Sequence, residues 1–420
     1  INTMKQQIMD LQQRLDDLQI SQGNELKEIK EKQDAVQIDF KDGKPTFKTG
    51  DGLFEMSIRG RAHFDVATGD TDGTLTPYNN GANFRRAEIG VEGKFMRDWG
   101  YVLGLQFGGT KDSSPTIIKE AYLSYNGISG IKIQGGAIGV PLTLDYATSS
   151  NDITFIERSS AANMMISLGS DDSRTAFGVR GNTDNVFGML YYTKDTVGTD
   201  ATTHAESDNV VGRVAVAFQP VEKSNIHLGL SGTYTPHFYK DPSIGDRPGI
   251  RVDDIKYIST PSITKVDKAL FYGPELAVSY GPFKAQGEYY RYSFDRTLGA
   301  ADADFSAWYA QASWVITGEA YKYSMDGAAY KGVKPASPFT LGGGIGAWEL
   351  AVRYSTADLN DSGSGLTKGG EEKMWTGGLN WYVNNNVRFM LDYIRAKEEG
   401  GGPKGEGTFN SVALRTQFAF

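Results

Sequence analysis

Residues 408–420 have the sequence Thr-Phe-Asn-Ser-Val-Ala-Leu-Arg-Thr-Gln-Phe-Ala-Phe. One set of alternate residues includes Val412, Leu414 and Phe418, while the other set is small or polar and includes Arg415. Side chains alternate between the two faces of a β-strand, so this stretch predicts a strand with one apolar and one polar face. About ten residues with the apolar face outward form the repeating unit of an outer-membrane barrel, and a terminal Phe is typical of such barrels. An amphipathic edge strand of a soluble sandwich is the alternative.

The composition favours the barrel over a helical membrane protein. The chain has 420 residues with 51 Gly, and 12% of its residues are aromatic. Its mean hydropathy is -0.39, and it contains no run of eighteen apolar residues that would predict a transmembrane helix. A barrel is compatible with this composition because half of each strand faces water.

Several classes of site are disfavoured. The chain has no Cys, and its four His are widely spaced without a metal-ligand motif, so we expect no cofactor and no metal. No Ser/His/Asp set or carboxylate pair has support from its position, so we expect no enzyme activity. The net charge of -8 argues against binding to nucleic acid.

Residues 1–36 differ from the rest of the chain. Apolar residues recur at heptad spacing, and they are Met4, Ile8, Leu11, Leu15 and Leu18. This spacing predicts a short coiled coil that holds subunits together, with a single helix docked on its own protein as the alternative. We therefore divide the chain into a periplasmic coiled-coil segment with its linker, residues 1–42, and a barrel domain, residues 43–420.

From residue 55 onward the apolar pattern changes to a period of two. In the first strand Met56, Ile58 and Phe64 share one face, whereas Arg59 and Arg61 share the other. Sixteen strands are predicted, near residues 55–67, 86–95, 99–109, 115–126, 131–139, 174–183, 186–195, 207–218, 225–236, 270–280, 283–294, 305–317, 345–357, 373–383, 386–397 and 407–420.

The segments between the strands alternate in length. Tight turns such as 127–130 and 281–282 alternate with long segments such as 140–173 and 236–269. The segment 318–344 is an exception, because it is long but falls on the side of the tight turns. This layout predicts a sixteen-stranded antiparallel transmembrane β-barrel, with both termini on the periplasmic side of the bacterial outer membrane.

Several short stretches resemble the phosphate-selective porin O/P family. They include Asn83-Phe-Arg-Arg-Ala87, Arg97-Asp-Trp99, Ala147-Thr-Ser-Ser150 followed by Glu157-Arg158, Gly346-Ala-Trp-Glu-Leu350 and Asn380-Trp-Tyr382. The resemblance spans most of residues 55–420. It implies a trimer of sixteen-stranded barrels, a loop at 140–173 folded into the pore, and basic residues that conduct anions.

The resemblance also assigns individual residues. Arg61, Arg86 and Arg158 match lumen or constriction arginines of the family, whereas the strand parity of Arg85 points it outward. The loop residues Arg247 and Arg251 match the family's arginine ladder only loosely.

The chain departs from the family pattern at three places. Tyr146 follows Leu144-Asp145 where the family has a lysine, and Lys119 stands where the family has an acid. Gly136 stands where the family has an arginine.

The leading hypothesis is a passive homotrimeric diffusion porin in outer-membrane lipid and lipopolysaccharide, which passes phosphate-like or other small anions. Strand parity adds further inward arginines to the family matches. The predicted solute-pathway residues are Arg59, Arg61, Arg86, Lys119, Tyr146, Arg158, Arg213 and Arg415. The same lumen also carries acids, so some of these arginines are expected to pair with them. One alternative is a general or sugar-conducting porin. Another is a structural barrel whose residues 1–36 tether the outer membrane to peptidoglycan.

Overall fold

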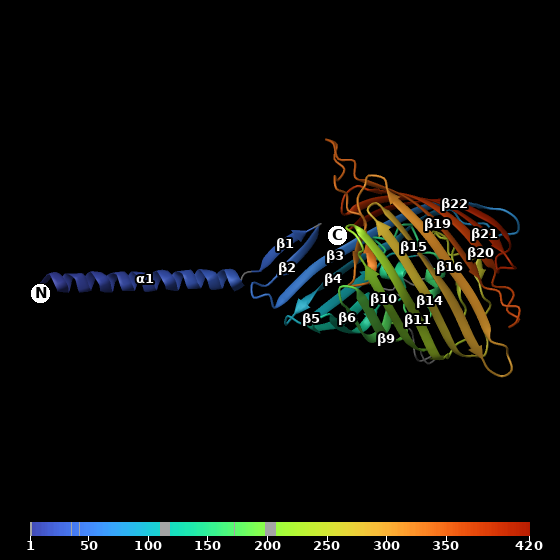
Figure 1. The fold of residues 1–420 in the computed structure, drawn as a ribbon, viewed down its shortest axis with the longest axis horizontal. Helices are drawn as coiled ribbons and strands as arrows, with labels where there is room; N and C mark the ends of the chain where they lie inside the picture. The colour runs from blue at the N-terminus through green and yellow to red at the C-terminus, as the bar shows by residue number, and fades with distance from the viewer. Residues whose placement is uncertain (1, 35, 42, 110–117, 172, 198–206) are drawn as a thin grey trace.

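The computed structural model describes residues 2–34, 36–41, 43–109, 118–171, 173–197 and 207–420. A long helix, α1 (Asn2–Asp34), projects from one end of a large β-barrel (Figure 1). The barrel strands are β3 (Phe54–Thr71), β4 (Gly81–Phe95), β5 (Trp99–Gln106), β6 (Ile118–Ile128), β7 (Ile131–Ile138), β8 (Arg174–Asn182), β9 (Val186–Thr196), β10 (Asp208–Phe218), β11 (Ser224–His237), β14 (Val266–Tyr280), β15 (Phe283–Arg296), β16 (Ala303–Val315), β19 (Ala347–Asp358), β20 (Glu371–Tyr382), β21 (Val387–Glu399) and β22 (Gly407–Ala419).

Each of these strands pairs antiparallel with its neighbours, and β22 closes the sheet by pairing with β3. Leu414 lies opposite Val66 and Arg415 lies opposite Asp65 in this closing pair. Closure leaves no unpaired strand edge, as a barrel in lipid requires. The predicted sixteen-stranded antiparallel barrel is confirmed, although β5 ends at Gln106 and the first residues of the strand expected at 115–126 lie outside the described residues.

The facing predicted for the final strand is also confirmed. Val412, Leu414 and Phe418 are 43%, 52% and 46% exposed on the outer surface, whereas Arg415 is 1% exposed in the interior. A continuous sheet has only two faces, so a single apolar strand face fixes which side of every neighbouring strand meets lipid.

Helix α1 runs without interruption through Gly23, where the heptad pattern of the sequence breaks. Its apolar seam is solvent-exposed in the single chain, from Met4 at 71% to Ile8 at 55%. A coiled coil through this seam stays a prediction. Within the described residues no helix is long and apolar enough to cross a bilayer.

A hairpin that we did not predict joins α1 to the barrel. It consists of β1 (Gln37–Lys41) and β2 (Lys44–Lys48), and β2 extends the sheet by pairing with the start of β3. The Asp-Gly pair at 42–43 is a strong hairpin signal in the sequence, which we interpreted only as a turn. The hairpin spans the boundary expected between residues 42 and 43, so that division stays a prediction.

Two long segments fold into the barrel from the end opposite the termini. The segment 140–173, described except for residue 172, contains α2 (Leu144–Ala147) and α3 (Ser160–Ser167). The segment 238–265 contains the short strands β12 (Gly245–Asp246) and β13 (Ile258–Ser259).

Both segments pack on the inner wall through apolar side chains. Met164 and Met165 of α3 lie in one cluster with wall residues such as Tyr292, whereas Ile250 lies in a second cluster with Met374. Much of the lumen is therefore filled with protein.

A third segment closes part of the end nearer the termini. It is the segment 318–344, the long connection on the side of the tight turns, and it contains β17 (Lys322–Ser324) and β18 (Ala329–Lys331). Tyr321 and Tyr330 of this turn are buried beside Leu144 of α2. Side chains of the barrel wall, of the segment 318–344 and of the loop 140–173 thus meet in one apolar cluster.

Candidate solute pathway

Acidic side chains of the wall hold the backbone of loop 140–173. Glu288 of β15 accepts hydrogen bonds from the amides of Leu144 at 2.7 Å and Asp145 at 3.1 Å. Asp392 of β21 accepts one from the amide of Ile156 at 2.8 Å. Buried backbone amides need such partners because no strand pairs with this loop. The loop is consequently fixed to two sides of the barrel.

Arginines of the wall hold carbonyls of the same loop. Arg353 of β19 donates to the Glu157 carbonyl at 2.9 Å. Arg388 of β21 donates to the Ile153 carbonyl at 2.8 Å. Both guanidinium groups are buried, so these two inward arginines support the loop.

Arg415 of β22 has the same role. Its guanidinium forms a two-bond pair with Asp65, at 2.6 and 2.7 Å. It also donates to the Ile156 carbonyl at 2.5 Å and to the Glu157 carboxylate at 3.0 Å. All three of its nitrogens are thereby engaged.

Arg213 of β10 supports the turn near the termini. It pairs with Glu275 through two bonds of 2.8 Å and donates to the carbonyls of Gly327 and Ala328. Arg213 and Arg415 are each 1% exposed. Their place in a solute pathway stays a prediction, and these contacts favour a structural role instead.

Water-accessible charges lie on the other side of the lumen. Strands β3 to β8 carry the more exposed of the inward charges, with side-chain exposure of 15% for Arg61 and 35% for Glu92. The other members of this half-exposed set are Arg59, Glu120 and Arg180. We infer that the open passage runs between loop 140–173 and strands β3 to β8.

Three predicted pathway residues meet along this passage. Arg61 and Lys119 each approach a different carboxylate oxygen of Glu88 at 2.8 Å. Arg59 forms an ion pair with Glu120 one step nearer the termini. These pairs show that the passage carries both signs of charge.

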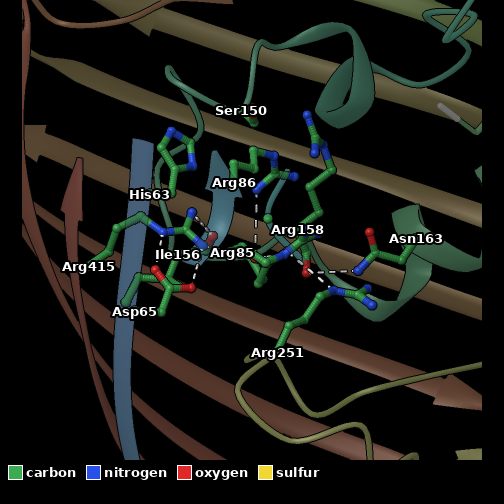
Figure 2. A network of polar contacts seen from close by, with 12 residues as sticks. His63, Asp65, Arg85, Arg86, Ser150, Ile156, Arg158, Asn163, Arg251 and Arg415 are labelled. Carbon is green, nitrogen blue, oxygen red and sulfur yellow. Dashed lines mark hydrogen bonds and ion pairs between the residues drawn. The ribbon is translucent and has the colours of Figure 1, made fainter. Parts of the chain in front are cut away.

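The centre of the lumen differs, because arginines surround one carboxylate. Glu157 of the loop lies 2.8 Å from Arg85, 3.0 Å from Arg415, 3.3 Å from Arg251 and 3.9 Å from Arg86. Figure 2 shows these four arginines converging from two strands and from the segment 238–265. Burial would raise the pKa of the Glu157 carboxyl, but the charges of Arg85, Arg415 and their neighbours hold that pKa well below its ordinary value.

Arg85 corrects an expectation. The alternation of β4 predicts an outward side chain, but its side chain points inward and its Nε donates to Glu157. The register changes at this point, since His63 pairs with Arg86 and Phe64 pairs with Phe84. Arg85 is therefore the extra residue of a β-bulge, which redirects its side chain into the lumen.

Arg158 and Tyr146 are also brought together. The Arg158 guanidinium lies 5.0 Å from the centre of the Tyr146 ring. It donates to the carbonyls of Asp145 at 3.0 Å and Thr148 at 2.8 Å. The tyrosine that replaces the family's lysine thus supports an arginine by a cation–π contact.

Arg86 has the least complete set of contacts in this group. Its Nη1 is buried and has no hydrogen-bond partner among the residues that the structure describes. Its nearest carboxylates, Glu157 and Glu88, lie 3.9 and 4.0 Å away. This guanidinium therefore retains a donor that no described group accepts.

Comparison with known proteins identifies the family of the chain. The family model described as phosphate-selective porin O and P matches residues 56–420. The chain belongs to this porin family. Membership indicates a channel of the outer membrane rather than an enzyme. Porin O of Pseudomonas aeruginosa is 25% identical over 421 aligned residues, which cover 89% of this chain and 90% of that protein.

Solved structures share the fold. The outer membrane channel DcaP of Acinetobacter baumannii has a TM-score of 0.54 at 12% identity, with 89% of this chain and 99% of that chain covered. The trimer form of OmpT, an outer membrane protein of Vibrio cholerae, has a TM-score of 0.52 at 11% identity, with 88% and 100% covered. At this identity the likeness concerns the fold alone.

The Glu157 centre predicts a large effect of one substitution. Glu157→Gln removes the carboxylate shared by four arginines and leaves Arg85 without an ion-pair partner in the described residues, so we expect a loss of about 3–5 kcal/mol in the free energy of unfolding. Urea titration of the refolded barrel measures this loss. Glu120→Gln, at a half-exposed pair, is the matched control and should cost about 1 kcal/mol or less.

The effect has a defined pH dependence. The folded-state pKa of Glu157 is depressed, so its stabilisation is complete above the ordinary carboxyl pKa and is lost as pH falls through the depressed value. The difference between wild type and Glu157→Gln should stay constant from pH 7 down to about pH 5. A difference that shrinks within that range would contradict the ion-pair account.

Proposed function

We propose that the chain forms a passive diffusion channel that prefers anions, including phosphate-like ones. The carrying observation is the convergence of Arg85, Arg86, Arg251 and Arg415 on the carboxylate of Glu157, where the Nη1 of Arg86 has no hydrogen-bond partner among the described residues. A fixed positive potential at a narrow point favours anions and opposes cations.

The residue type supports this proposal. A guanidinium is always charged, and its planar donors match the oxygens of phosphate and carboxylate. Arg61, Lys119 and Arg59 lie along the half-exposed passage, and each faces a glutamate. An anion that moves along the passage would contact these basic side chains one after another. No covalent step or cofactor is required for this movement.

The departures from the family pattern favour a broad anion preference over strict phosphate selection. Tyr146 replaces a charged side chain, and Lys119 is neutralised by Glu88 at 2.8 Å. The family's name refers to phosphate, and a general or sugar-conducting porin remains the alternative. Block of chloride conductance by phosphate, compared with liposome swelling in neutral sugars, distinguishes the two.

We further propose a homotrimer with its termini in the periplasm. A trimer form is described for the structurally similar OmpT. The exposed heptad seam of α1 supplies a surface for three-helix association. Its 33 residues reach roughly 50 Å from the barrel, which is long enough to contact peptidoglycan, the partner of the tether hypothesis (Figure 1).

Arg86 offers the sharpest test of the pathway. Arg86→Ala removes a guanidinium whose Nη1 has no hydrogen-bond partner in the described residues, so we expect the anion-to-cation permeability ratio to fall two- to fivefold, which corresponds to about 0.5–1 kcal/mol. Reversal potentials of single channels in a salt gradient measure this ratio. Arg395→Ala, on the outer face of β21, is the control and should leave it unchanged. An equal ratio in both variants would remove Arg86 from the pathway.

Deletion of residues 1–36 separates transport from tethering. We expect the shortened protein to keep the single-channel conductance and ion preference of the full chain, because α1 lies outside the barrel. Sedimentation with purified peptidoglycan should fall in the deletion variant if α1 is a tether. Equal sedimentation of both proteins would reject the tether, and altered ion preference would place α1 in the pathway.

A further inference from the structure

The ends of β20 and β21 that lie away from the termini carry four glutamates. Glu371 and Glu399 face outward, where lysines neutralise them. Lys373 lies 2.8 Å from Glu371 and 3.4 Å from Glu399, and Lys397 lies 2.5 Å from Glu399. The outward acids thus have counter-charges on the same two strands.

The two inward glutamates differ. Glu372 and Glu398 lie directly opposite each other in the strand pair and are 1% and 2% exposed. Glu372 Oε1 accepts a hydrogen bond from Ser160 Oγ at 2.7 Å. The two carboxyl groups are within hydrogen-bonding reach of each other, and Glu372 Oε2 and both oxygens of Glu398 accept no hydrogen bond from any other group of the described residues.

Nearby charged groups do not neutralise this pair. Asp246 adds negative charge to the surroundings of Glu372, and Arg353 adds positive charge to them. Arg353 donates to the Glu157 carbonyl, and Arg251 is engaged by Asp246 at 2.7 Å. Neither glutamate has an ion pair within 4.0 Å in the part of the chain that the structure describes. Two like charges opposite each other in a buried strand pair are strongly destabilising unless something compensates them.

We propose that Glu372 and Glu398 bind a divalent cation, with Ca²⁺ the best fit. The ligands would be both oxygens of Glu398, the Oε2 of Glu372 and the Ser160 hydroxyl, completed by water. Ca²⁺ accepts such oxygen sets in flexible geometry and accommodates a bidentate carboxylate. A shared proton would satisfy only one oxygen pair and would leave the remaining unpartnered oxygen buried.

The site has a structural consequence for the channel. Ser160 is the first residue of α3, and α3 belongs to the loop that narrows the lumen. A cation held between β20, β21 and Ser160 would fasten this end of the loop to the wall, where Asp392 fastens its middle. The proposal concerns the fixation of the loop and is independent of the ion preference of the pore.

Thermal unfolding of the full-length protein in detergent tests the proposal. After treatment with EDTA and dialysis at pH 7.5, added CaCl₂ should raise the unfolding temperature of wild type by roughly 3–6 °C. The variant E372Q/E398Q should lose this response. The outward variant E371Q/E399Q is the matched control and should respond as wild type does.

Other outcomes overturn the proposal. Equal responses of wild type and E372Q/E398Q place the cation elsewhere. A wild type that ignores CaCl₂ but gains stability as pH falls from 7.5 to 5.5 has a proton between the two glutamates. If the double variant does not fold, the single variant E398Q is compared with wild type by equilibrium dialysis with Ca²⁺. E398Q should bind one fewer ion per chain than wild type, and an equal number of bound ions rejects the site.

Discussion

The position of loop 140–173 inside this barrel depends on hydrogen bonds between wall side chains and the backbone of the loop. Glu288 and Asp392 accept its amides, while Arg353, Arg388 and Arg415 donate to its carbonyls. A loop in a lumen has no strand partner, so each buried polar group of its backbone would otherwise cost free energy. The wall therefore uses charged residues to support the loop, which explains why many inward arginines are buried.

This support divides the lumen into two halves with different tasks. On β9 to β22 the charges are buried and hold the loop or the turn near the termini, as Arg213 and Arg415 do. On β3 to β8 some of the charges are partly exposed and line the passage, as Arg59 and Arg61 do. The Glu157 centre lies where the two halves meet, and there four arginines converge on one carboxylate.

The sequence predicted the architecture well because the period-two pattern of each strand is local. The family resemblance matched Arg61, Arg86 and Arg158 to lumen or constriction arginines. In the structure Arg61 contacts Ser150 of the loop, Arg86 lies 3.9 Å from Glu157 and Arg158 belongs to the loop itself. Parity failed at Arg85, because a β-bulge is a property of two paired strands and leaves little trace in one. Strand parity also could not distinguish arginines that support the loop from arginines that line the passage. That distinction depends on where the loop packs against the wall. The hairpin of β1 and β2 had a usable signal, the Asp-Gly pair flanked by apolar residues.

The central claim is that the arginines gathered at the Glu157 centre set the sign of ion preference despite the net charge of -8 of the whole chain. Fixed charge close to a passing ion outweighs distant charge, because salt screens the latter within about 10 Å. The most direct measurement is the reversal potential of the wild-type channel in a KCl gradient. We expect a reversal potential with the sign of the chloride equilibrium potential, which indicates anion preference. A reversal potential with the sign of the potassium equilibrium potential would contradict the claim.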